Sequence, residues 1–262
     1  MKIPCIALAA ALLAASAGAA DTVLGTLPNT AATVTDSANV VLTFGGGAAY
    51  TPLADWPQTN NLLFAFTFGS DGTTDDSGNG HTLVYGAGAA APTYVDATNG
   101  LSFDGTADFA AVGTANDHFN GLATATIACW AKRDALGTRY SMTPSNSTAG
   151  IGFQILTSGA RGILRDVVTG IETMNTGTWY HHVLTFDNGA TPDARLYVDG
   201  IYVQSVSIAS GTLTVSGKYL LGAYTPASTF YDGNLDDVGG WTSVLTSNEV
   251  FNLYVDTAAA HP

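Results

Sequence analysis

The sequence predicts an all-β protein, an antiparallel two-sheet jelly-roll sandwich with a short C-terminal helix. The first observation behind this prediction is an Asp-Gly pair that follows an aromatic or β-branched residue three times, in Phe103–Gly105, Val198–Gly200 and Tyr231–Gly233. Such pairs are strong hairpin signals, because Gly adopts a positive φ without steric cost. The second observation is the 30 glycines among 262 residues, which indicate frequent turns. Many short strands between frequent turns are typical of a sandwich or jelly roll.

The individual strands are expected where side chains alternate with a period of two. In the segment 125–132, for example, Ala125, Ile127, Cys129 and Ala131 would share one face, with Trp130 on the other. The same alternation predicts strands in the segments 62–68, 181–186, 195–198, 202–208 and 219–221.

One helix is expected near the C-terminal end. Thr246 and Glu249 have the spacing of a capping box, in which the Thr hydroxyl and the Glu carboxylate satisfy each other's backbone amides. Val250, Leu253 and Tyr254 then give a short apolar stripe. We expect this helix to seal one edge of the domain.

The charge balance excludes several partners. Eight Lys and Arg residues face 21 Asp and Glu residues, which gives a formal net charge of −13. Nucleic-acid binding requires basic residues for the phosphates, and docking on anionic membranes requires them as well. We therefore expect no nucleic acid and no membrane as partner of the mature form.

The chain divides into four parts. Residues 1–20 resemble a secretory signal peptide, with a basic start, an apolar run and small residues at the end; the alternative is an apolar N-terminal arm buried in an assembly. Residues 21–60 read as an extension or linker with one possible strand, 61–257 as the jelly roll and 258–262 as a tail. Cleavage after the signal would remove Cys5 and leave Cys129, so no disulfide framework is expected.

From Leu62 to Tyr254 the chain resembles the laminin-G-like family of the concanavalin A-like lectin/glucanase superfamily. Seven segments in the family's order carry the resemblance: Leu63–Phe66, Asp76–His81, Gly100–Phe109, Thr126–Lys132, Thr178–Val183, Arg195–Gly200 and the closing segment made of Tyr231–Trp241 and Leu245–Tyr254. The resemblance implies two twisted antiparallel sheets packed face to face, often a calcium ion near one rim, and binding of glycans or proteins. The same fold also carries glycoside hydrolases, so the fold alone does not determine the function.

A calcium site is predicted at Asp75, Asp76, Asn79 and Asp236, with Ca²⁺ as the tentative cofactor. Ca²⁺ prefers six to eight oxygen ligands, and the first three residues offer side-chain oxygens within one Gly-broken loop. The resemblance places Asp236 on a strand near that loop. The alternative is that these residues hold turns through Asx hydrogen bonds.

The motifs of common enzymes are missing from the sequence, so we expect no enzymatic activity. Glycoside hydrolysis normally needs two flanking carboxyl groups, and the Glu-x-Asp-x-x-Glu strand of the superfamily's hydrolases does not occur. The sequence also contains no Gly-x-Ser-x-Gly nucleophile elbow and no Cys and His spacing typical of a zinc site. His181 and His182 are interpreted as histidines of a sheet.

A binding surface is predicted on rim loops that carry aromatic residues. Tyr140 and Asn146 flank one polar loop, and Tyr224 and Phe230 flank another. These four residues are the candidate ligand contacts; the alternative is that the rings pack the loops.

The predicted function is a non-enzymatic, secreted or cell-surface, lectin-like adhesion domain that recognises a glycan or a surface protein with the support of calcium. The alternative is a structural subunit of an extracellular assembly, such as a virion or filament, that displays this domain and self-assembles through residues 1–60. A third, more distant hypothesis is an accessory module of a carbohydrate-active enzyme.

Overall fold

The computed structural model describes residues 33–35, 41–43, 56–113, 118–145, 150–165, 167–215 and 217–261. The predicted signal peptide at residues 1–20 lies outside this part. The chain forms two units, Met1–Tyr50 and Thr51–Pro262. In the first unit, β1 (Thr33–Thr35) and β2 (Val41–Thr43) pair antiparallel. Among the described residues, no helix is long and apolar enough to cross a membrane.

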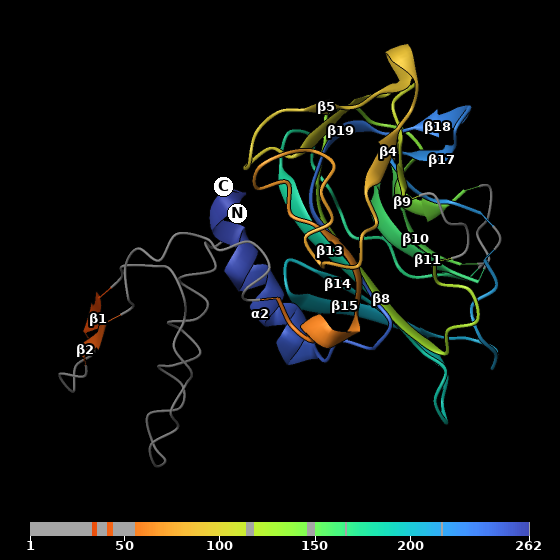
Figure 1. Cartoon of the computed structure of the whole chain (residues 1–262). Helices are drawn as coiled ribbons and strands as arrows, with labels where there is room; N and C mark the ends of the chain where they lie inside the picture. The colour runs from red at the N-terminus through yellow and green to blue at the C-terminus, as the bar shows by residue number, and fades with distance from the viewer. Residues whose placement is uncertain are drawn as a thin grey trace. The chain divides into compact units, whose positions relative to one another are not determined.

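The second unit is the predicted sandwich of two antiparallel sheets (Figure 1). Within the described residues, the seven-stranded sheet has the order β12 (Val167–Val168), β11 (Gly159–Leu164), β10 (Ile151–Leu156), β9 (Arg139–Pro144), β16 (Tyr219–Leu221), β7 (Ala110–Val112) and β4 (Leu83–Tyr85). The eight-stranded sheet has the order β15 (Ile201–Ser207), β14 (Asp193–Val198), β13 (Trp179–Asp187), β8 (Thr124–Arg133), β19 (Asp232–Trp241), β6 (Leu101–Asp104) and β5 (Thr93–Tyr94), and β3 (Leu62–Phe66) also pairs with β19. The all-β, two-sheet prediction is confirmed.

Short elements complete the unit. The strands β17 (Ala223–Thr225) and β18 (Ser228–Phe230) form a separate hairpin. The 3₁₀ helices η1 (Thr59–Asn61), η2 (Gly88–Ala90) and η3 (Ala258–Ala260) and the helix α2 (Ser247–Thr257) are the described helical segments.

The main core lies between the two sheets. On β8, the predicted set of Ala125, Ile127, Cys129 and Ala131 faces this core and is fully buried. The intervening Ala128 belongs to a second cluster, which lies on the other face of the same sheet. The period of two therefore holds, but both faces of β8 are buried.

The helix α2 supplies the cover of that second face. Val250 and Leu253 pack with Val183 of β13 and Trp241 of β19. The predicted capping box is present: the Thr246 amide donates to Glu249 Oε2 at 2.7 Å, and the Glu249 amide donates to Thr246 Oγ1 at 3.3 Å. The helix covers a face of the sheet, and the expectation that it seals an edge is wrong, because its apolar stripe meets the central strands.

Two of the three Asp-Gly pairs form turns. Asp199 and Gly200 have φ values of 50° and 74° and join β14 to β15, as a two-residue hairpin turn requires. Gly105 follows β6 with a φ of 70°. The third prediction is wrong, because Gly233 lies inside β19. A Cβ on Gly233 would lie 2.0 Å from the carbonyl oxygen of Lys132, so glycine is needed there for close strand approach.

The neighbouring histidines of β13 are buried on opposite faces of the sheet. His182 lies beside Phe153 in the sandwich core, whereas His181 lies beside Trp130 under the C-terminal helix. Burial disfavours the charged imidazole and lowers the pKa of His181 to about 3 and that of His182 to about 4.

This burial predicts a loss of stability in acid. Between pH 6.5 and pH 4 the unfolded chain binds a proton at His182 that the folded chain does not, so stability falls with falling pH. We expect about 3 kcal/mol of the unfolding free energy to be lost through this residue between pH 7 and pH 4. Urea unfolding of wild type and His182→Gln over this pH range measures the difference.

The control for this experiment is His81→Gln in a loop, which should keep the acid dependence of the wild type. Parallel stability curves for wild type and His182→Gln would contradict the prediction.

Candidate functional site

The outer face of the seven-stranded sheet carries a row of polar and aromatic side chains from three of its strands and from the β17–β18 hairpin. Arg161 Nε donates to Gln154 Oε1 at 2.8 Å, and Gln154 Nε2 donates to the Tyr140 hydroxyl at 2.8 Å. The Tyr140 ring packs on the ring of Tyr224, with centroids 4.8 Å apart. We call these four residues, Arg161, Gln154, Tyr140 and Tyr224, the tyrosine row.

An irregularity in β9 brings Tyr140 into this row. Met142 pairs with Phe153 and Tyr140 with Gln154, so Ser141 is an additional residue in β9. Such a bulge reorients the side chains that follow it. Tyr140 thus lies beside Gln154, while Met142 stays in the core.

The tyrosine row is partly shielded from water. Gln154 is 6 % exposed, and the other three side chains are half-buried. Burial and the neighbouring Tyr224 raise the pKa of Tyr140, and Arg161 opposes this shift. Tyr140 is therefore a neutral hydroxyl at physiological pH and acts as a hydrogen-bonding group.

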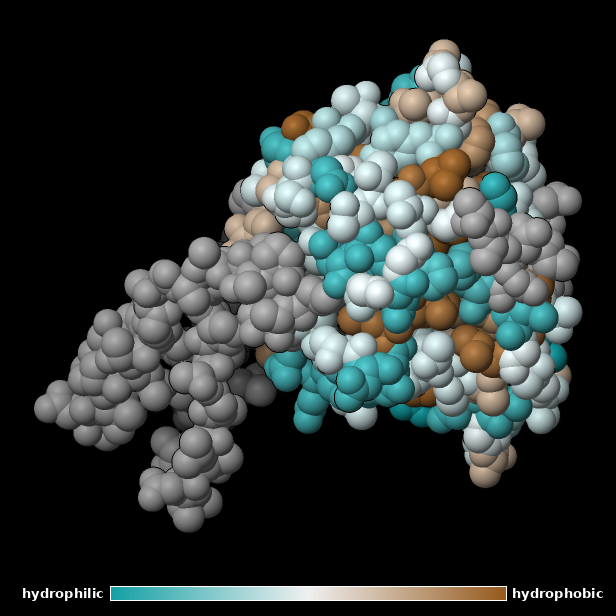
Figure 2. Space-filling view, viewed as in Figure 1, coloured by the Kyte–Doolittle hydropathy of each residue, from teal (hydrophilic) through white to brown (hydrophobic). Residues whose placement is uncertain are grey.

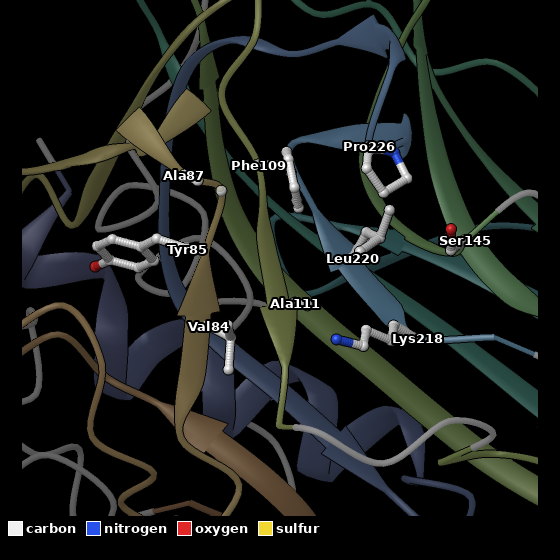
Figure 3. Close-up of a pocket in the computed structure, with 10 residues that line it drawn as sticks. Val84, Tyr85, Ala87, Phe109, Ala111, Ser145, Lys218, Leu220 and Pro226 are labelled. Atoms are coloured by element: carbon white, nitrogen blue, oxygen red, sulfur yellow. The ribbon is translucent and has the colours of Figure 1, made fainter. Parts of the chain in front are cut away.

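A hollow of about 460 Å³ lies on the face of the same sheet (Figure 3). Its floor includes Ala111 of β7 and Leu220 of β16, which alternate with residues of the sandwich core. Phe109 and Pro226 project beside Leu220, and Lys218 adds a cation. Pro226 belongs to the turn of the β17–β18 hairpin that also carries Tyr224, so the hollow and the tyrosine row share one loop.

Of the four predicted ligand contacts, the structure brings two together. Tyr140 and Tyr224 form the aromatic end of the tyrosine row. Phe230 lies on β18 opposite Ala223 and is half-buried, and Asn146 lies outside the described residues. Gln154 and Arg161 were missed by the sequence analysis, and the alternation of β10 was the one signal that could have placed Gln154 on an outer face.

The predicted calcium loop lies along the edge of β3. Asp75 Oδ1 accepts hydrogen bonds from the Ala65 and Ser77 amides at 3.0 Å, and its Oδ2 accepts one from the His81 amide at 2.9 Å. Asp76 Oδ2 accepts hydrogen bonds from the Thr67 backbone amide and hydroxyl, and the side-chain amide of Asn79 donates to the carbonyl oxygen of Leu62. The three side chains are thus near one another, with hydrogen bonds that hold the loop.

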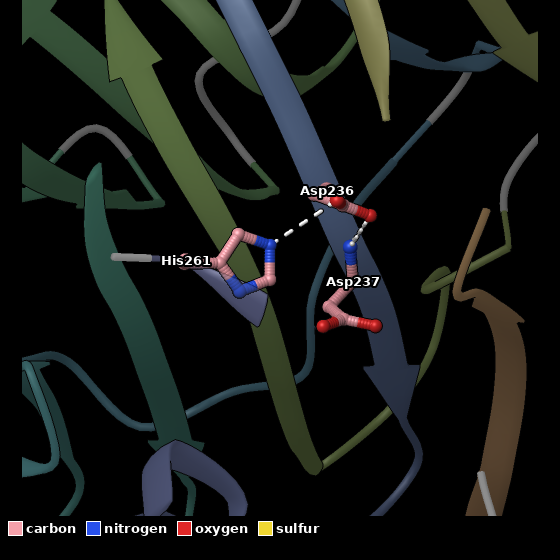
Figure 4. A group of neighbouring side chains, drawn as sticks. All are labelled: Asp236, Asp237 and His261. Atoms are coloured by element: carbon pink, nitrogen blue, oxygen red, sulfur yellow. Dashed lines mark hydrogen bonds and ion pairs between the residues drawn. The ribbon is translucent and has the colours of Figure 1, made fainter. Parts of the chain in front are cut away.

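Asp236 lies in a different group. Among the described residues, one set of three metal-ligating side chains has ligand atoms within 4.8 Å of one another, and it contains Asp236, Asp237 and His261 (Figure 4). Asp75 and Asp76 are not part of this group. All three members are buried, with Asp236 1 % and His261 6 % exposed.

The buried pair of Asp236 and His261 is held close. Asp236 Oδ2 lies 3.1 Å from His261 Nε2, and Asp236 Oδ1 accepts from the Asp237 amide at 2.8 Å. Burial raises the pKa of Asp236 well above its ordinary value and lowers the pKa of His261. Both directions favour the neutral forms of this pair.

The comparisons place the chain among lectin-like folds. Residues 104–251 match the model of a family described as the concanavalin A-like lectin/glucanases superfamily, which is more than half of the chain. No curated protein matches the sequence.

Solved structures share the fold at low sequence identity. The receptor binding domain of botulinum neurotoxin C/D mosaic serotype has a TM-score of 0.61 at 13 % identity, with 75 % of this chain and 51 % of that chain covered. The botulinum neurotoxin serotype D ligand binding domain in complex with N-acetylneuraminic acid has a TM-score of 0.58 at 12 % identity, with 75 % of this chain and 51 % of that chain covered. The binding domain of Paraclostridial Mosquitocidal Protein 1 has a TM-score of 0.58 at 19 % identity, with 75 % of this chain and 52 % of that chain covered. The chain thus spans about half the length of these domains.

The hydrogen bonds of Asp75 in the predicted calcium loop predict that Asp75→Ala destabilises the protein more than Ser77→Ala does. Asp75→Ala removes the acceptor for three backbone amides and the Ser77 hydroxyl. We expect it to lower the unfolding free energy by about 1–3 kcal/mol, as measured by urea unfolding. Ser77→Ala, which removes one donor, is the matched control with a smaller loss; equal effects of the two variants would contradict this role for Asp75.

Proposed function

Because the chain belongs to the concanavalin A-like lectin/glucanases superfamily, we propose that it is a non-enzymatic, extracellular binding domain that recognises a glycan through the outer face of the seven-stranded sheet. The tyrosine row carries this proposal. It presents two adjacent rings and a chain of donors and acceptors beside a hollow of about 460 Å³. An aromatic surface with a few placed polar groups is the usual composition of a small-ligand site.

The charges of this face favour an acidic or neutral glycan. Figure 2 shows hydrophilic residues interspersed with residues of intermediate hydropathy and with hydrophobic ones, and the whole chain carries a net charge of −13. Arg161 in the row and Lys218 in the hollow are two of its eight basic residues. Since one of the similar structures is a complex with N-acetylneuraminic acid, sialylated glycans are the first class to test, with neutral glycans as the second.

The two Glu residues have structural contacts that favour binding over hydrolysis. Glu249 is engaged in the capping box, and the backbone of Glu172 forms an isolated bridge with Ala160. This use of the two Glu residues supports binding without cleavage. A glycan that binds and is recovered intact is the expected outcome.

A glycan array tests this proposal. The wild type is expected to bind a defined glycan class, and Tyr140→Ala or Tyr224→Ala should weaken binding about tenfold or more, through loss of an aromatic contact. Tyr202→Ala is the matched control, because this tyrosine is 51 % exposed on β15, away from the site. A blank array, or binding that survives both Tyr substitutions, would reject the site, and capture of a surface protein by the same face would replace the glycan as ligand.

Calcium support is a separate proposal for the loop with Asp75, Asp76 and Asn79 and for Asp236. Carboxylates and carbonyl groups are the ligands that Ca²⁺ prefers. We expect Ca²⁺ to raise the melting temperature of chelator-treated protein, and Asp76→Asn to reduce the effect. An unchanged melting temperature on addition of chelator and of Ca²⁺ would contradict the proposal.

A further inference from the structure

The group of Asp236, Asp237 and His261 brings two carboxylates and one imidazole together in the protein interior. Their ligand atoms lie within 4.8 Å of one another, although His261 is distant in sequence from the two acids (Figure 4). His261 follows η3, and the acids lie in the middle of β19. The group therefore joins the C-terminal segment to the eight-stranded sheet.

A bulge in β19 allows the side chains of the neighbouring Asp236 and Asp237 to approach the same side chain, His261. On a regular strand, successive side chains point to opposite faces. Here the pairing of β19 with β8 shifts between Asp236 and Gly239, and Asp237 has a φ of 43°, in the left-handed region. Non-glycine residues in this region are strained and are often found at functional sites. The strained backbone thus delivers both carboxylates to His261.

The imidazole is oriented by its other nitrogen. His261 Nδ1 lies 3.0 Å from the carbonyl oxygen of Thr257, which only accepts hydrogen bonds, so Nδ1 carries the proton. Nε2 therefore offers its lone pair toward Asp236. A bond from the second ring nitrogen to a backbone carbonyl is the arrangement that metal-binding histidines typically show.

Aromatic rings fix this orientation. The His261 ring stacks on Trp130 with centroids 4.4 Å apart and an angle of 10° between the planes, and Trp179 contacts it edge-on at 4.9 Å. Trp130 Nε1 donates to Thr257 Oγ1 at 2.7 Å, which ties the same tryptophan to the end of α2. The ligand atom is thus held by packing on both sides.

Two buried atoms of the group lack an aligned hydrogen bond. Asp236 Oδ2 and His261 Nε2 are 3.1 Å apart, yet neither has a hydrogen-bond partner of acceptable angle. Their side chains are 1 % and 0 % exposed. Buried polar atoms are nearly always satisfied, and two atoms aimed into one space at this separation match neighbouring ligands of one small cation, with bonds of about 2.0–2.2 Å.

We propose that Asp236, Asp237 and His261 form a binding site for a divalent transition-metal ion, with Zn²⁺ as the probe. Imidazole with carboxylates suits Zn²⁺ and its neighbours in the first row, whereas Ca²⁺ requires a larger set of oxygen ligands. A divalent ion balances the charge of two buried carboxylates. The ion would also link the segment that follows α2 to β19, so its binding would stabilise the packing of that segment on the eight-stranded sheet.

Calorimetric titration of the full chain with Zn²⁺, after treatment with chelator, tests this site. We expect one Zn²⁺ per chain and a higher melting temperature in its presence. His261→Ala and Asp237→Asn should each weaken Zn²⁺ binding at least about tenfold, and Asp237→Asn preserves the shape of the side chain. His81→Ala, whose ring packs on His118 elsewhere in the unit, is the control that should bind like wild type.

Three outcomes would overturn the proposal: Zn²⁺ fails to bind, Zn²⁺ binds equally well to His261→Ala, or His261→Ala abolishes a rise in melting temperature that Ca²⁺ causes in the wild type. Co²⁺ gives an independent readout, because a His and carboxylate site produces a visible absorption spectrum that should be lost in His261→Ala. None of these results depends on glycan binding.

Discussion

The central strands β8, β13 and β19 of the eight-stranded sheet are buried on both faces, and this constraint arranges the rest of the described unit. One face of β8, β13 and β19 closes the sandwich core, and the other is covered by α2 and the segment with His261. Nearly every residue of these three strands is therefore buried. Among their buried polar residues, His181 and His182 are kept neutral by burial.

Because the central strands of the eight-stranded sheet have no free face, we place recognition on the other sheet. The described part of the seven-stranded sheet has no helix packed in the way that α2 covers β8 and β13. Instead its outer face carries Gln154 and Arg161 in a hydrogen-bonded row and a hollow over Leu220. The glycan site and the metal site proposed above thus lie on different sheets of the sandwich.

Two irregularities of the strands create the two candidate sites. The additional residue Ser141 in β9 turns Tyr140 toward Gln154. The shift between Asp236 and Gly239 in β19 brings two neighbouring acids to His261. Bulges commonly re-aim side chains next to functional sites, and here each one interrupts a strand whose remaining residues follow the regular alternation.

Local signals explain what was predictable from the sequence. The hairpin at Asp199 and Gly200 and the capping box of Thr246 and Glu249 depend on residues close in the chain, and both are confirmed. Gly233 shows the limit of such signals. Its Asp-Gly pair is the same as the pair that forms the turn at Asp199 and Gly200, but glycine is needed at position 233 because the backbone of Lys132 approaches closely across the sheet.

The sites were less predictable because they depend on tertiary contacts. Tyr140 and Tyr224 were identified as aromatic residues flanking loops, and the structure places their rings together. Gln154 and Arg161 were missed because a bulge, which the sequence does not signal, sets the register that joins them to Tyr140. His261 was missed because its distance along the chain from Asp236 resembles no ligand spacing.

A crystal structure of the chain with a glycan selected on the array would show whether the outer face of the seven-stranded sheet is the recognition surface. We expect the sugar to lie against Tyr140 and Tyr224, with hydrogen bonds to Gln154 or Arg161. A sugar bound at the Asp75 loop, or on the side covered by α2, would contradict this expectation.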